Sequence, residues 1–131
     1  MDYDMTITLD LPYEQAVPAV KAALAEQGFG VLTEIDAQAT LKEKLGHDME
    51  HYVILGACNP QLAHRALDLD RQIGPLLPCN VVVRADGDTR SIVSALDPQI
   101  MVTIPEREDL RPVADEAGVR IRAALDALTS G

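Results

Sequence analysis

Two cysteines, Cys58 and Cys79, are each followed by an asparagine, Asn59 and Asn80, and these pairs are the residues best suited to chemistry. A cysteine sulfur acts as a nucleophile, a reversible redox centre or a ligand for soft metals. His64 lies close to Cys58 in the sequence and would serve as a base or a third ligand. The sequence therefore suggests a redox thiol pair, a persulfide or sulfur-carrying site, or a soft-metal site, and leaves ligand and cofactor unknown.

These residues also have a structural explanation that needs no function. Buried cysteines commonly pack as small hydrophobic residues. Asn59 before Pro60 is typical of a helix N-cap followed by proline at the first helical position, and Asn80 would cap a loop. There is no Cys-x-x-Cys motif, and the spacing of Cys58 and His64 is not a zinc pattern. Packing is therefore the simpler account of the cysteines, and no metal is predicted.

The predicted strands next to the cysteines indicate where the two cysteines lie relative to each other. The apolar run 52–55, bounded by Gly56, indicates a well-covered central strand, and 81–83 indicates another. If these strands are antiparallel neighbours, the end of the first lies beside the start of the second. Cys58 and Cys79 would then share one corner with His64. The N-terminus of the intervening helix would stabilise a thiolate or bind a small anion there.

The segments on either side of the second strand are less regular. Residues 71–78 contain two prolines and are predicted to form a loop, in which Leu76 and Leu77 either pack over the core or contact a partner. The pair Asp86-Gly87 is a strong hairpin signal. A two-residue turn there would place Ala85 opposite Asp88, and Cys79 near Ser94.

The remaining elements alternate between strand and helix patterns. A half-buried strand is predicted over 3–9 and a second strand over 29–35, and a short helix capped by Asp36 is predicted to end at Gly46. An early helix contains Pro18, so it should start late or be kinked. A long amphipathic helix follows Glu106. With the hairpin, this pattern favours an α+β fold in one domain spanning 1–131.

Composition limits the possible functions. The chain has 131 residues, 47% of them apolar, which suffices for a core without disulfides or metals. A net charge of −10 and few aromatic residues disfavour binding to nucleic acid or an anionic membrane. No apolar run approaches the ~20 residues that span a bilayer, and the acidic N-terminus is unlike a secretory signal. We therefore expect a cytoplasmic protein with free cysteines.

Four segments, in order along the chain, resemble a known family. They are Gly28–Asp36, Thr40–Gly46, Ile54–Pro60 and Leu77–Val81. Together they resemble the domain-of-unknown-function family numbered 302. The resemblance implies a two-layer sandwich with helices on one face of a curved, mainly antiparallel sheet, connected like half of a TATA-binding protein. It also implies a homodimer, and it implies no particular activity.

The sequence leaves two hypotheses open for the function of the chain. The first is a thiol-handling or small-molecule-binding accessory domain that works through Cys58, Cys79, Asn59, Asn80 and His64. The second is a non-catalytic homodimeric interaction module whose cysteines only pack, suggested by the apolar loop 75–78. A hydrolase using His64 has no supporting spacing, and no phosphate loop or nucleophile elbow is present, so enzymatic activity is not predicted.

Overall fold

The structure, a computed structural model, describes residues 3–77 and 79–129. Met1, Asp2 and Pro78, which entered the sequence arguments, lie outside the described residues. The strands are β1 (Asp4–Leu9), β2 (Gly30–Asp36), β3 (Tyr52–Cys58), β4 (Cys79–Asp86) and β5 (Arg90–Leu96). The α-helices are α1 (Tyr13–Glu26), α2 (Ala37–Leu45), α3 (Pro60–Leu69), α4 (Ile100–Thr103) and α5 (Arg111–Thr129). Short 3₁₀ helices span Arg71–Leu76 and Glu108–Leu110.

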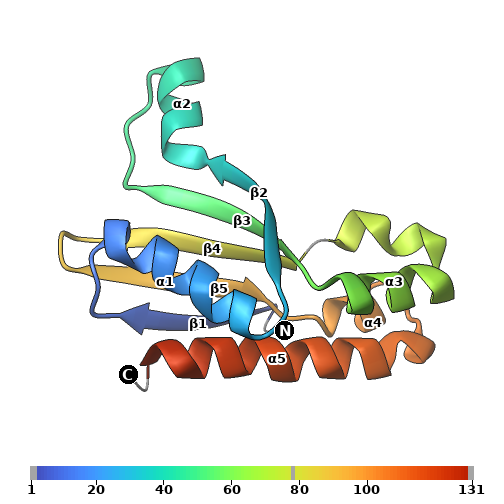
Figure 1. The fold of residues 1–131 in the computed structure, drawn as a ribbon. Coiled ribbons are helices and arrows are strands. Elements are labelled where there is room, and N and C mark those ends of the chain that lie inside the picture. The colour runs from blue at the N-terminus through green and yellow to red at the C-terminus, as the bar shows by residue number, and fades with distance from the viewer. Residues whose placement is uncertain (1–2, 78, 130–131) are drawn as a thin grey trace.

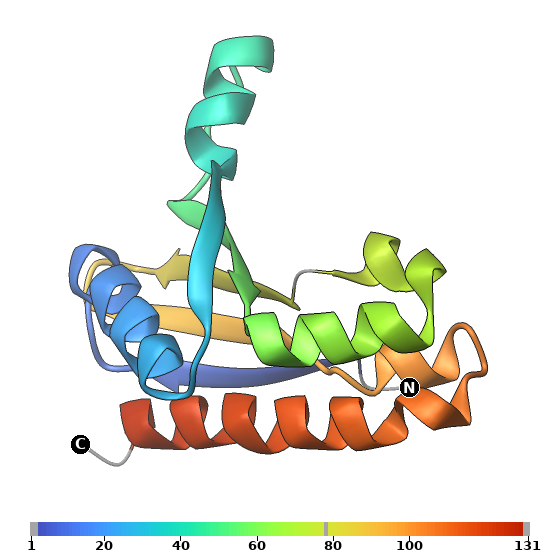
Figure 2. The ribbon, with the colours of Figure 1, turned by 45° about the vertical axis from the view of Figure 1, so that its right-hand side comes forward.

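The strands form one open antiparallel sheet in the order β1-β5-β4-β3-β2. Helices α1 and α5 lie side by side over one face of this sheet, while α3 and α4 lie beyond the ends of the strands (Figure 1). The expected α+β architecture, with helices packed on one face of an antiparallel sheet, is confirmed. The second view shows that α5 runs the length of the molecule beneath the sheet and α3 (Figure 2).

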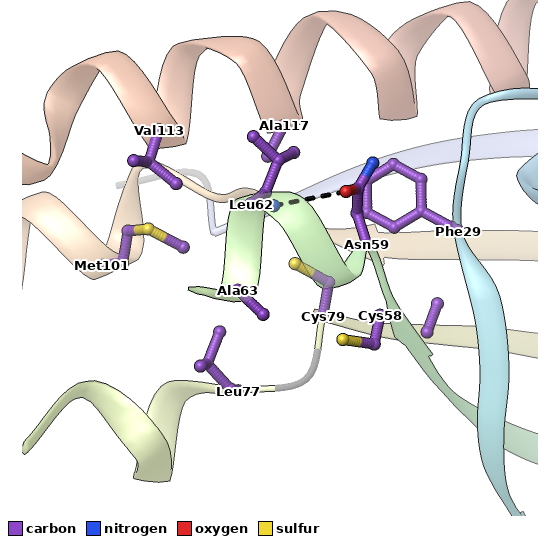
Figure 3. Close-up of a pocket in the computed structure, with 11 residues that line it drawn as sticks. Phe29, Cys58, Asn59, Leu62, Ala63, Leu77, Cys79, Met101, Val113 and Ala117 are labelled. Carbon is purple, nitrogen blue, oxygen red and sulfur yellow. Dashed lines mark hydrogen bonds between the residues drawn. The ribbon is translucent and has the colours of Figure 1, made fainter. Parts of the chain in front are cut away.

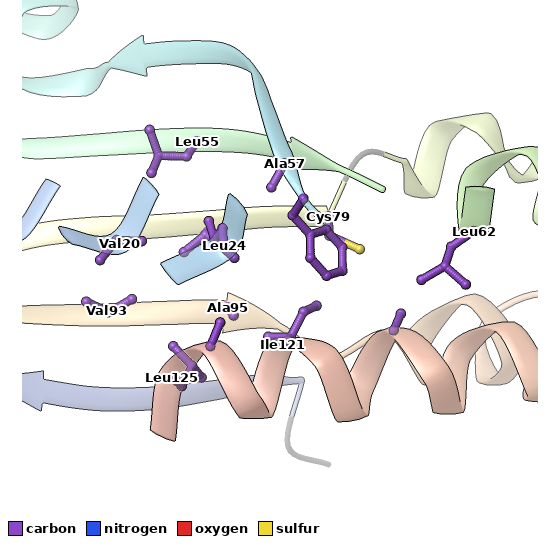
Figure 4. Packing of buried hydrophobic residues seen from close by; sticks show 14 of the residues in the cluster. Val20, Leu24, Leu55, Ala57, Leu62, Cys79, Val93, Ala95, Ile121 and Leu125 are labelled. Atoms are coloured by element: carbon purple, nitrogen blue, oxygen red, sulfur yellow. The ribbon is translucent and has the colours of Figure 1, made fainter. Parts of the chain in front are cut away.

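The core is an aliphatic layer between the sheet and the two long helices. Alternate side chains of the strands, such as Leu55, Val83 and Val93, point into this layer, because successive side chains of a strand face opposite sides. They meet Val20 of α1 and Ile121 of α5 (Figure 4), each of which belongs to a row of buried residues at helical spacing. Local apolar periodicity therefore predicted the faces that form the core.

One local prediction from proline positions was wrong, and one of the two alternatives for the helix that contains Pro18 is excluded. Helix α1 begins at Tyr13, directly after Pro12, and continues through Pro18 rather than starting late. Burial of residues on both sides of Pro18 outweighs the one hydrogen bond that proline removes. Residues 71–76, expected to be a loop, form a 3₁₀ helix because Ile73 is buried and the Asp70 carboxylate accepts a hydrogen bond from the Gln72 N–H.

The hairpin between β4 and β5 has a longer turn than predicted. Asp86 pairs with Arg90, so three residues form the turn, and Gly87 adopts a positive φ of 75°. Ser94 consequently lies opposite Val82, and the expected position near Cys79 was wrong. The turn is one residue longer and begins one residue later than predicted, so the partner of Ala85 is Ser91 rather than Asp88 and the pairing of the whole strand shifts.

Residues 32–50, which we call the arm, leave the core. The register between β2 and β3 shifts between Val31 and Thr33, and beyond this point β2 is exposed. Helix α2, capped by Asp36 and ended by Gly46 as predicted, has no buried residue. The arm projects from the rest of the molecule (Figures 1 and 2). The strand predicted over 29–35 is therefore present as β2, but its side chains are exposed beyond Val31.

Candidate functional site

The cysteines lie at one end of the sheet, at the junction of β3 and β4. These strands are antiparallel neighbours, and the register pairs Cys79 with Ala57. Cys58 is the next residue of β3, so the structure brings the two cysteines together in the way that the strand order suggested. They are not bonded to each other: both are free thiols, Cys58 half-buried and Cys79 buried.

Both cysteines line one small pocket between the end of the sheet and the helices (Figure 3). Its volume is about 20 Å³, room for a water-sized group or a single ion and too little for a drug-sized ligand. Among the described residues, every lining side chain apart from the cysteines and Asn59 is apolar. These residues are Phe29, Ala57, Leu62, Ala63, Leu77, Met101, Val113 and Ala117.

Asn59 fixes the chain between Cys58 and α3. Its side-chain Oδ1 accepts a hydrogen bond from the Leu62 N–H at 3.3 Å, the predicted N-cap interaction, and the residue is 9% exposed. Gly28 lies against this amide: it has a φ of +82°, and a Cβ placed there would lie 3.0 Å from the Asn59 Nδ2. A glycine at position 28 therefore leaves room for the cap, which in turn sets where Cys58 is held.

The pocket keeps both thiols protonated at neutral pH. Burial, and secondarily the charge of Cys58, raises the pKa of Cys79 from 9.0 to about 11. Burial also raises the pKa of Cys58. The sequence suggested that the N-terminus of α3 stabilises a thiolate, which would lower these pKa values. Both pKa values are raised instead, so that expectation was wrong.

The backbone around Asn59 explains why the helix start does not favour a thiolate. Pro60 has no N–H, and the Leu62 N–H is bound to the Asn59 side chain. The Ala63 N–H is bound to the Asn59 carbonyl oxygen at 2.9 Å. Most of the free donors that a helix start offers to an anion are therefore already used, and desolvation of the sulfur atoms dominates.

The structure does not bring His64 or Asn80 to the pocket. The His64 side chain is 75% exposed, and its Nε2 lies 3.3 Å from the Asp68 Oδ2 one helical turn further along α3. Asn80 pairs with Gly56 in the sheet and lies exposed on the face without helices, because neighbours of a buried strand residue point the opposite way. The idea of His64 as base or third ligand beside the thiols is thus not supported by its position.

Sequence reasoning missed Met101 as a pocket residue. Met101 belongs to the four-residue helix α4, which has no side-chain cap, so no start signal indicates it. Its position in the apolar run 100–102 would have predicted burial, and Met101 is 5% exposed.

Within residues 3–77 and 79–129, no three His, Cys, Asp or Glu side chains are grouped closely enough to hold a metal ion. No helix in these ranges combines the length and apolarity needed to cross a membrane.

Comparisons with known proteins agree with the fold. The crystal structure of uncharacterized conserved protein DUF302 from Bacillus stearothermophilus is similar to this chain with a TM-score of 0.89 and 28% sequence identity. The similarity covers 98% of this chain and 99% of that one. Among curated proteins, none matches the sequence. The family model described as "Domain of unknown function DUF302" matches residues 5–128, and the chain therefore belongs to this family.

Proposed function

We propose that this chain is a non-catalytic binding domain that holds a small, sulfur-seeking ligand between Cys58 and Cys79. The observation that carries this proposal is that two free thiols from neighbouring strands line one pocket with otherwise almost entirely apolar walls. An apolar pocket excludes water from its ligand, and a pair of thiols supplies two bonds to it.

The chemistry of the pocket favours binding over turnover. A thiol with a raised pKa is a weak nucleophile at neutral pH, because the thiolate is the reactive form. In the part of the chain that the structure describes, no histidine, aspartate or glutamate lines the pocket as a general base. Cys58 is the entry point, since it is half-buried whereas Cys79 is buried.

A trivalent arsenical tests whether the thiols act as a pair. Methylarsenous acid, CH₃As(OH)₂, forms two As–S bonds with two thiols and releases two waters. We expect the reduced full chain to gain one bridged CH₃As group by intact-mass spectrometry, and Cys58→Ser to gain none that survives dilution. Arg71→Lys, at an exposed position that is not among the residues lining the pocket, is the control and should behave as the unaltered chain.

Thermal melting separates this proposal from simple packing. Because Cys58 is only half-buried, Cys58→Ser should leave the melting temperature nearly unchanged while it abolishes the bridged adduct. A large loss of stability in this variant, together with an unaltered chain that accepts no bridging arsenical, would mean that the cysteines only pack.

A second candidate is the non-catalytic homodimeric module, now favoured by a different observation. The apolar loop that first suggested it does not support it, because Leu76 and Leu77 pack against the core. The arm does support it. Leu32, Ile35 and Leu45 are 68%, 52% and 75% exposed, and a helix without buried residues gains little stability from its own chain.

Sedimentation at micromolar concentration tests the dimer. If the arm is the contact, the unaltered chain should sediment as a dimer, and Leu45→Glu should convert it to a monomer. Val119→Glu is the matched control, since Val119 is a similarly exposed apolar residue, 71% exposed, on α5. A monomer at every concentration would overturn this candidate without affecting the thiol pocket.

A further inference from the structure

A third sulfur atom faces the same pocket as the two cysteines. Met101 reaches the pocket from α4, on the side opposite the β3–β4 junction, while Cys58 and Cys79 come from the strand ends (Figure 3). The pocket thus gathers both cysteines of the chain and one methionine from three separate elements.

The remaining lining determines what kind of ion suits these sulfurs. Hard cations such as Mg²⁺ and Ca²⁺ need several oxygen ligands. Among the described lining residues the only side-chain oxygen belongs to Asn59, where it already accepts the Leu62 N–H. Structural zinc sites need four nitrogen, sulfur or carboxylate ligands, and the lining has only the two cysteines of that kind. Thiolate and thioether sulfurs together select Cu(I).

The size and electrostatics of the pocket fit the same ion. A volume of about 20 Å³ admits one ion and no metal cluster. Two thiolates with one Cu⁺ carry a net charge of −1, which is easier to bury than two unpaired thiolates.

We propose that the pocket binds one Cu(I) ion through the thiolates of Cys58 and Cys79, with the thioether of Met101 as a third ligand. Binding replaces two S–H protons by two Cu–S bonds and releases both protons to solvent, without any change in oxidation state. The apolar walls shield the ion from water. This assignment rests on the proposed function, since it names the ligand that the thiol pair holds.

Competition with a chromophoric Cu(I) chelator, in the absence of oxygen, tests the assignment on the full chain. We expect one Cu(I) per chain. Removing a group that only orients a metal ligand costs roughly 10–100-fold in affinity. Cys58 and Cys79 are themselves ligands, so Cys58→Ser or Cys79→Ser should weaken Cu(I) binding by more than about 100-fold. Met101→Leu, which keeps the packing volume, should weaken it about tenfold, as expected for the weaker ligand. Met49→Leu, in the arm, is the matched control and should have no effect.

Several outcomes would overturn the metal site. These are equal Cu(I) affinity in the unaltered chain and Cys58→Ser, or tighter binding of Zn²⁺ than of Cu(I). An unaltered affinity in Met101→Leu would remove Met101 from the ligand set. If Cys79→Ser does not fold, Cys58→Ser decides alone, because the Cys58 side chain is only half-buried.

The arsenical and Cu(I) tests together distinguish the two proposals. If the arsenical bridges both thiols but Cu(I) does not bind, the thiol-pair function stands and the metal assignment fails. If neither binds, both proposals fail.

Discussion

Helices α3 and α2 begin with the same kind of cap, but only α3 packs against the core. Each follows a strand and starts at a side-chain cap: Asn59 accepts the Leu62 N–H, and Asp36 accepts the Ala39 N–H. Yet α3 buries Leu62 and Ala66, whereas α2 buries nothing. The comparison shows that a cap decides where a helix begins, and that packing decides whether the helix supports the core.

The two helices differ because they occupy opposite ends of the sheet. α3 packs against α5 and the 3₁₀ helix that follows it, and so closes the corner that contains the cysteine pocket. In the described part of the chain, α2 contacts mainly the strands that carry it, β2 and β3. The same kind of local sequence therefore builds a pocket wall in one place and an exposed arm in the other.

The largest expected effect compares a leucine of each helix. Leu62→Ala removes a side chain that is 4% exposed and should lower the free energy of unfolding by about 2–5 kcal/mol. Leu45→Ala on α2 should change it by less than about 0.5 kcal/mol, because Leu45 is 75% exposed. Urea denaturation of both variants, with dimer content checked, measures the difference. Equal losses would contradict the contrast between the helices.

The next effect is a pH dependence that arises from the pocket. The pKa of Cys79 is raised from 9.0 to about 11 in the folded chain, so the folded state keeps a proton that the unfolded state loses. This contribution is fully present below pH 9 and disappears as the pH rises toward 11. The loss should approach about 2–3 kcal/mol.

Comparison with Cys79→Ala isolates this contribution, since other groups also titrate at alkaline pH. The free energy of unfolding of the unaltered chain should fall more steeply between pH 9 and 11 than that of the variant. Parallel pH profiles for the two proteins would show that Cys79 is not desolvated as the structure indicates.

Two glycines with positive φ provide a finer comparison. Gly46 ends α2 with a φ of 65° and open space around it, so Gly46→Ala should cost only the backbone strain, about 1 kcal/mol. At Gly28 the added Cβ would also lie 3.0 Å from the Asn59 Nδ2, and the cost should be larger by about another 1 kcal/mol. Thermal melts of both variants test this. Equal costs would mean that the Asn59 amide moves aside freely.

The smallest effect concerns the caps themselves. Asn59→Ala should destabilise the whole domain by about 1 kcal/mol, because α3 unfolds only with the core. Asp36→Ala should leave global stability nearly unchanged and instead speed amide hydrogen exchange in α2, since the arm can open locally. If Asp36→Ala lowers the melting temperature as much as Asn59→Ala does, the arm is part of the cooperative unit.

The sequence by itself determined most of the local structure. The Asn59 and Asp36 caps and the stop at Gly46 follow from short-range patterns, and all three are present. These features depend on the backbone geometry of a few adjacent residues, which the side-chain types dictate directly.

Only the tertiary structure decided which residues meet at the pocket and which elements remain exposed. Met101 joins the cysteines and His64 does not, because the path of the chain after β5 brings α4 back to the corner while His64 faces solvent. The exposure of α2 depends on a register shift in β2 that no apolar period indicates. Burial depends on the contacts of distant segments, and these depend on the whole chain rather than on any local run of residues.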